Sequence, residues 1–170
     1  HLVLLDTCGD SRWVQEKAPQ VLAERGYSAE TVETARRFFN GEIAPREMVP
    51  AMIKFAGAYN HNLSPLQQLR AIILGLRMKT RPEALIFGYS QLAKGWSVMD
   101  RLGEIQVPTL VLAGRHDFQF PPEHQAELAA GIDNARLEII EEAGHNAHSE
   151  RPAEVMRAVR EFMLSAVPSA

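Results

Sequence analysis

Three apolar runs along the chain have the pattern of parallel strands. Residues 1–6 and 107–113 are almost continuously apolar, and residues 136–140 form a shorter run of the same kind. Helices cover both faces of a parallel sheet, so its strands lack the polar alternation of a half-exposed strand. The pattern therefore predicts three strands of a mostly parallel sheet.

Between the first two strands, residues 11–95 have almost purely helical patterning. Ser28 is a good N-cap for a helix that stops at Gly41, and further helices are predicted near residues 45–55 and 82–87. The most regular apolar face is predicted for a helix that begins at Ser64-Pro65; this face comprises Leu66, Leu69, Ile73 and Leu76.

After residue 107, strands and helices alternate. A helix is predicted over residues 122–130, and a final helix has Pro152 in its first turn. This order predicts an α/β protein with part of a doubly wound, mostly parallel sheet and an inserted helical cap. We assign residues 1–10 and 96–170 to the sheet domain and residues 11–95 to the insertion.

The composition narrows the classes of function. The chain has 170 residues, 46% of them apolar, a net charge of −3 and a pI near 6.1. This charge provides no basic footprint for a nucleic acid or an anionic membrane, and neither is an expected partner. Cys8 stands alone, so no intrachain disulfide indicates an oxidising compartment, and the expected location is the cytoplasm.

Two residues with catalytic potential follow the second and third predicted strands. Asp117 comes three residues after Gly114, and His145 follows Gly144, 28 residues after the acid. Because the carboxyl ends of parallel strands meet at one edge of a sheet, we expect the two side chains to converge. An acid that orients an imidazole is two thirds of a Ser-His-Asp triad. The nucleophile motif G-x-S-x-G is absent from the sequence.

Other residues compete for these roles. Asp6 and Asp10 follow the first strand and are the alternative acids. A metal site built from His116, Asp117, His145 and His148 is conceivable, but the spacing fits no helix-borne metal motif and we expect no metal or cofactor. His148 is expected to be hydrogen-bonded behind the site, and His116 is expected to point away from the acid.

Three candidate nucleophiles lie within the chain, and each departs from the required motif. Ser90 and Ser97 each follow a glycine by two residues, but Leu92 and Met99 replace the second glycine. Cys8 lacks flanking glycines on both sides, and we interpret it as a buried or turn thiol.

Two segments resemble the α/β-hydrolase superfamily in its lidded serine-hydrolase branch. They are residues 105–117, with the pattern I-x-V-P-T-L-V-L-A-G-x-x-D, and residues 144–152, with the pattern G-H-x-x-H-x-E-x-P. The resemblance is specific for roughly the last 70 residues. It implies that the three strands are the last three of the family's sheet and that residues 11–95 are the cap. It also implies that Asp117 is the triad acid and His145 the triad base. In the family's order of Ser, acid and His, the serine would lie upstream of His1.

The resemblance implies a serine hydrolase that acts on esters, lactones, amides such as N-terminal prolyl peptides, or similar carbonyl substrates. The chain opens inside a strand and without Met, so we expect it to be the C-terminal half of that enzyme and inactive alone. The strand of residues 2–5 is expected to pair with the missing half or with a second copy of the chain. The alternative is a catalytically inactive binding or interaction module of the same fold.

Overall fold

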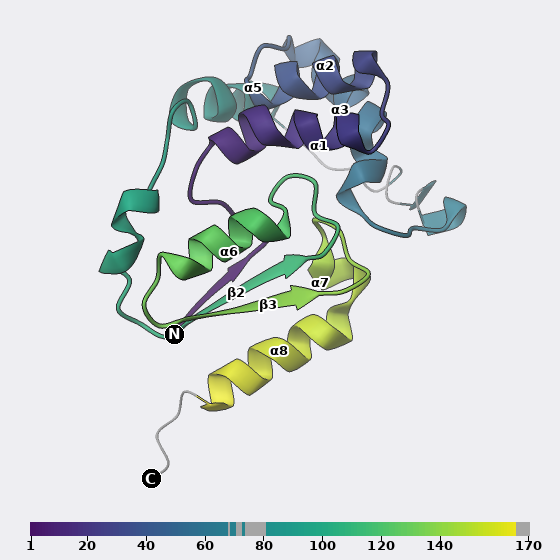
Figure 1. The fold of residues 1–170 in the computed structure, drawn as a ribbon. Coiled ribbons are helices and arrows are strands. Elements are labelled where there is room, and N and C mark those ends of the chain that lie inside the picture. The colour runs from purple at the N-terminus through teal and green to yellow at the C-terminus, as the bar shows by residue number, and fades with distance from the viewer. Residues whose placement is uncertain (68, 71–72, 74–80, 166–170) are drawn as a thin grey trace.

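The computed structural model describes residues 1–67, 69, 70, 73 and 81–165. Its sheet has three parallel strands in the order β1-β2-β3: β1 (Leu2–Leu5), β2 (Thr109–Gly114) and β3 (Ala135–Ile140). Figure 1 shows the strands running in one direction, with their carboxyl ends toward the same side of the molecule. The predicted fold class is confirmed, and the strand bounds lie within two residues of those expected.

Two helices cover the two faces of the sheet (Figure 1): α6 (Pro122–Ala130) and α8 (Pro152–Ser165). Leu110 and Leu112 of β2 pack in one cluster with Phe162 of α8, whereas Val111 packs in another with Leu128 of α6. Successive side chains of a strand point to opposite faces, so both faces of β2 are buried. This burial explains why the run is apolar without alternation.

A helical layer lies beyond the carboxyl ends of the strands (Figure 1). Its described elements are η1 (Trp13–Lys17), α1 (Ala18–Glu24), α2 (Ala29–Phe39), η2 (Pro45–Glu47), α3 (Met48–Phe55), η3 (Ala56–Tyr59), α5 (Pro82–Phe87) and η4 (Gly88–Leu92). Leu22, Phe39 and Phe55 are fully buried in the core of this layer. Phe118 and Phe120, from the loop after β2, join the same core and attach the layer to the sheet.

The ends of α2 follow the sequence signals. Ser28 Oγ accepts a hydrogen bond from the backbone N–H of Thr31 (3.2 Å), as an N-cap does. At the other end, the backbone N–H of Gly41 donates to Phe38 O and that of Glu42 donates to Arg37 O. Gly41 has a φ of +66°, which this helix-ending turn requires. Both predicted ends of the helix are confirmed.

Part of the predicted helix at Ser64-Pro65 lies outside the described residues, and Leu76 is among those left out. Its described start has a reciprocal cap, because Ser64 N donates to Gln67 Oε1 (2.9 Å) and Gln67 N donates to Ser64 Oγ (3.3 Å). Ser97 Oγ accepts from Met99 N (3.3 Å) at the start of η5 (Met99–Glu104).

The chain leaves the sheet and returns to it through two adjacent segments. Asp10 and Ser97 form an isolated antiparallel bridge. Beside this bridge, Ser11 N donates to Trp96 O (2.9 Å) and Val98 N donates to Gly9 O (2.8 Å). Among the residues that the structure describes, no helix is both long enough and apolar enough to cross a bilayer.

Candidate active site

The loops after β2 and β3 bring Asp117 and His145 into contact. His145 Nδ1 lies 2.9 Å from Asp117 Oδ2, and the carboxyl group of Asp117 is fully buried. The other carboxylate oxygen, Oδ1, accepts the backbone N–H groups of Gln119 (2.8 Å) and Phe120 (3.1 Å). A carboxylate held in this way acts as an acceptor toward His145, so Nδ1 carries the imidazole proton and Nε2 keeps its lone pair.

Two opposing influences set the pKa of His145. Burial lowers this pKa, but the hydrogen bond that His145 donates to Asp117 and the negative charges of Asp117 and Asp6 raise it. The net pKa of His145 lies above the ordinary value for histidine, so the site stabilises the protonated form more than water does. This is the electrostatic behaviour that a base requires if it is to hold a proton in mid-reaction.

A close backbone approach makes the Asp117–His145 contact possible. A Cβ atom at Gly114 would lie 2.1 Å from Gly144 O and 2.5 Å from Ala143 O. Both distances are shorter than any van der Waals contact, so a side chain does not fit at this position. Glycine at position 114 therefore lets the end of β2 lie against the segment that carries His145.

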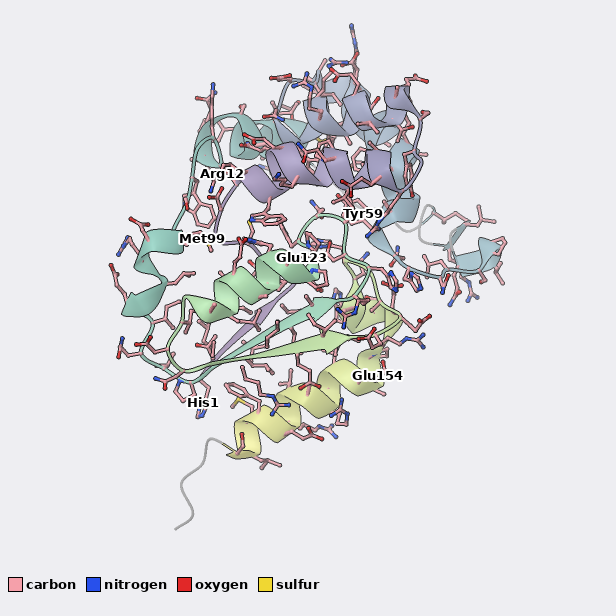
Figure 2. The ribbon with its side chains drawn as sticks, in the orientation of Figure 1. His1, Arg12, Tyr59, Met99, Glu123 and Glu154 are labelled. Carbon is pink, nitrogen blue, oxygen red and sulfur yellow. The ribbon has the colours of Figure 1, made fainter. Side chains whose placement is uncertain are left out.

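Two aromatic rings contact the imidazole of His145. Tyr59 of the helical layer and Phe120 each make an edge-to-face contact with it at 5.5 Å between ring centroids. Figure 2 places Tyr59 where the helical layer meets the loops that follow the strands. Tyr59 O also accepts the backbone N–H of Asn146 (3.2 Å), so the layer contributes directly to the position of His145.

Glu150 links the helical layer to the His145 loop, a role that the sequence reasoning missed. One carboxylate oxygen accepts Gly144 N and the other accepts His61 N, both at 2.7 Å. The glutamate is part of the G-H-x-x-H-x-E-x-P pattern, which was the available signal, but a pattern alone does not show which backbone groups it reaches.

A cavity of about 470 Å³ opens beside His145. This volume is within the range of small-molecule sites. His145 and Phe120, from the loops that follow the strands, line one part of the cavity. Tyr89 of the helical layer and Trp96 also line it. Cys8 and Ser11 also line it, and Ser11 Oγ is buried without a hydrogen-bond partner among the described residues. No motif in the sequence had indicated a role for Ser11.

The competing acids make no contact with His145 that resembles that of Asp117. Arg12 donates to both carboxylate oxygens of Asp10, and these hydrogen bonds lower the pKa of that carboxyl group. Asp6 has a φ of +47°, and neither of its buried carboxyl oxygens has a hydrogen-bond partner among the described residues. Burial, together with the charge of Asp117, raises the pKa of Asp6 to about 7.

We expect the contribution of Asp6 to the unfolding free energy to fall as the pH rises from about 4 to about 7, because folded Asp6 keeps its proton while unfolded aspartate loses it near 3.8. Asp6→Asn should remove up to about 4 kcal/mol of this pH dependence, since each pKa unit corresponds to about 1.4 kcal/mol. Asparagine also tolerates a positive φ. Urea unfolding at pH 4.5 and 8 measures the effect, with exposed Asp133→Asn as the control. Equal pH dependence in both variants would contradict the assignment.

The remaining candidates are placed as follows. Ser90 lies in η4. Burial raises the pKa of the Cys8 thiol to about 11, so the thiolate of Cys8 is disfavoured.

His148 is half-exposed, and its Nδ1 lies 3.9 Å from Asp6 Oδ2, too far for the hydrogen bond we expected. His116 stacks on His61 and not on the acid, so the four-residue metal cluster considered from sequence does not assemble.

Comparison with known proteins bears on this geometry. Residues 33–152 match the family model described as the alpha/beta hydrolase fold. The chain belongs to the alpha/beta hydrolase fold family. This membership confirms the family suggested by the sequence, and its relatives include hydrolases.

Among the relatives, a 2-hydroxy-6-oxo-6-phenylhexa-2,4-dienoate hydrolase from Comamonas testosteroni is 41% identical over 68 residues, which cover 40% of this chain and 24% of that protein. The solved structure of a proline iminopeptidase from Mycobacterium smegmatis has a TM-score of 0.66 at 22% identity and covers 97% of this chain. An alpha/beta fold family hydrolase from Bacillus anthracis has a TM-score of 0.68 at 19% identity. These structural likenesses establish the fold, and the chain spans 56% and 57% of the two solved chains.

Proposed function

We propose that this chain supplies the acid and the base of a Ser-His-Asp hydrolase, with Asp117 as the acid, His145 as the base and the nucleophilic serine in residues that precede His1. The observation that carries the proposal is the 2.9 Å contact between His145 Nδ1 and the buried carboxylate of Asp117, beside a cavity that His145 lines. Membership in a family that includes hydrolases supports the same conclusion.

In the proposed mechanism, His145 Nε2 takes the proton of the serine hydroxyl as that oxygen attacks a substrate carbonyl. Asp117 keeps the imidazole in the tautomer with Nδ1 protonated and stabilises the imidazolium that forms. The imidazolium then gives its proton to the leaving group. Water next attacks the acylated serine while His145 takes a proton from that water, and His145 returns the proton to the serine oxygen as the acyl group leaves. The chemistry needs no cofactor.

We propose a carbonyl substrate with an apolar or aromatic body. The aromatic side chains of Tyr89, Trp96 and Phe120 line the cavity beside the base. Esters, lactones, amides including N-terminal prolyl peptides, and carbon–carbon bonds next to a carbonyl all fit this reaction class. The printed functions of the dienoate hydrolase and the proline iminopeptidase fall within it. Residues 11–95 are the proposed cap, because Tyr89 from this segment lines the cavity together with His145.

The edge of the sheet needs a partner. In the described part of the chain, β1 pairs with β2 alone, so the other side of Leu2–Leu5 leaves its backbone groups open. We propose that a strand from residues preceding His1 covers this edge. Sedimentation velocity of the 170-residue chain should show self-association. Protein that retains the residues preceding His1 should not self-associate through β1. A stable monomer of the short chain would contradict this, and a specific dimer of the longer protein would favour a second copy as the partner.

The pH dependence of ester hydrolysis tests the proposed function. In protein that retains the residues preceding His1, kcat/KM for a p-nitrophenyl ester should fall as the pH drops. The fall should follow a pKa above about 6.5, because His145 has a raised pKa and therefore becomes protonated at a higher pH than an ordinary histidine. No hydrolysis of activated esters at any pH, together with ligand binding in the cavity, would favour the alternative of an inactive binding module.

A further inference from the structure

A second cluster of titratable side chains lies outside the candidate active site, where the helical layer meets the sheet. It comprises His61, which follows η3, His116 from the loop after β2, and Glu142 from the loop after β3. The imidazole rings of His61 and His116 stack with centroids 3.5 Å apart and planes within 7°. His61 Nε2 lies 3.4 Å from Glu142 Oε2. One potential ligand atom from each residue lies within 4.8 Å of the other two.

The backbone of each histidine is fixed by contacts that leave its imidazole ring available. The N–H of His61 donates to Glu150 Oε2 (2.7 Å). The N–H of His116 donates to Ala143 O (2.8 Å), and its carbonyl oxygen accepts Arg25 Nη2 (2.9 Å). The two rings are therefore presented side by side by segments that are far apart in the sequence.

Glu142 is also held in an unusual conformation. Its φ is +54°, in the left-handed region that a residue with a side chain seldom adopts. Its carbonyl oxygen accepts Arg151 Nε (3.2 Å), and Asn62 Nδ2 donates to its carboxylate oxygen Oε2 (3.4 Å). Such a conformation persists when the surroundings enforce it, and it is frequent at ligand sites. In this conformation Glu142 Oε2 lies 3.4 Å from His61 Nε2.

Two imidazoles and one carboxylate form a ligand set that suits Zn²⁺, and three protein ligands leave a fourth position of the tetrahedron for water. Mg²⁺ and Ca²⁺ prefer sets composed of oxygen atoms. We propose that His61, His116 and Glu142 bind one Zn²⁺ ion at the junction between the helical layer and the sheet.

Coordination requires a defined local rearrangement. An imidazole binds a metal in the plane of its ring, with a Zn–N distance of about 2.0–2.1 Å. Two parallel stacked rings do not direct their lone pairs at one point, so one ring must turn about its Cβ–Cγ bond. The guanidinium groups of Arg25 and Arg151 oppose a cation here, but both are bound to backbone carbonyl oxygens. The carboxylate of Glu142 and the nearby carboxylate of Glu150 favour it.

The position of the cluster gives the ion a structural consequence. His116 precedes Asp117 directly, and Glu142 lies three residues before His145. Glu150 already joins the backbone of His61 to Gly144. Zinc would therefore tie the loops that carry Asp117 and His145 to the helical layer. An ion that binds the folded state alone raises the unfolding temperature in proportion to the logarithm of its concentration.

The test is a zinc titration of the protein with any residues preceding His1 retained, after metal removal by a chelator. Isothermal titration calorimetry should show one Zn²⁺ equivalent that His61→Phe and His116→Phe each weaken at least about 10-fold. Phenylalanine preserves the aromatic stack and removes the ligand nitrogen, so folding is maintained. His148→Ala is the matched control, because it removes a half-exposed histidine outside the cluster. Mg²⁺ is the control ion.

Two further readouts locate the ion. Zinc should shift the imidazole resonances of His61 and His116 as the stack opens, and Glu142→Gln should reduce the zinc-induced rise in Tm. Zinc binding that is absent, that is unchanged in both phenylalanine variants, or that is lost in His145→Ala would overturn the proposal. None of these measurements uses enzymatic turnover. The zinc proposal can therefore fail while the proposed function stands, and the proposed function can fail while the zinc proposal stands.

Discussion

Replacing His145 with alanine is expected to lower the turnover of an activated ester by about 10⁶-fold in protein that retains the residues preceding His1. Without the imidazole, nothing accepts the serine proton, and the Asp117 carboxylate loses the group it orients. The loss should appear in kcat more than in KM, because the base acts on the transition state and not on ground-state binding. Steady-state kinetics with a p-nitrophenyl ester measures both.

His148→Ala is the matched control for that variant. It also replaces a histidine with alanine, but at a position three residues after His145 where 55% of the side chain is exposed. We expect its turnover to stay within a few-fold of the unmodified protein. Equal turnover in His145→Ala and in the unmodified protein would remove His145 from the mechanism.

Asp117→Asn is expected to reduce turnover by about 10⁴-fold. The asparagine oxygen can still accept the N–H groups of Gln119 and Phe120, so the loop keeps its anchor. Its amide group then faces Nδ1 of His145 as a donor, which favours the tautomer with the proton on Nε2. In that tautomer the base has no lone pair toward the cavity.

Asp6→Asn is the variant that separates the two acids. It removes a buried carboxyl group at the end of the neighbouring strand but leaves the Asp117–His145 contact intact. We expect a small change in rate and a slightly lower pKa of His145, because the charge of Asp6 contributes to raising that pKa. A large loss of activity in Asp6→Asn with a small loss in Asp117→Asn would transfer the role of the acid to Asp6.

The strands and their covering helices could be predicted because local patterns determine them. The doubly buried run at 107–113 indicated β2, and the prolines at the start of α6 and α8 marked helix ends that the structure reproduces. The convergence of Asp117 and His145 follows from a topological rule for parallel strands, so it needed no knowledge of contacts. The structure brings the pair together, and their catalytic role stays a prediction.

Contacts between distant segments could not be predicted in the same way. Nothing in the spacing of His61, His116 and Glu142 indicates that they meet, because the helical layer must first fold over the ends of the strands. The same holds for Glu150, whose two oxygens bind backbone groups 6 and 89 residues away. His148 was assigned a hydrogen bond from its place in a motif, but its side chain is half-exposed.

The most direct test of the central claim is covalent labelling with a fluorophosphonate, which reacts with an activated serine, followed by mass-spectrometric mapping of the modified residue. In protein that retains the residues preceding His1, we predict one labelled serine upstream of His1, with labelling lost in His145→Ala and in Asp117→Asn. Labelling of Ser11, Ser90 or Ser97, or upstream labelling that persists at full rate without His145, would contradict the account.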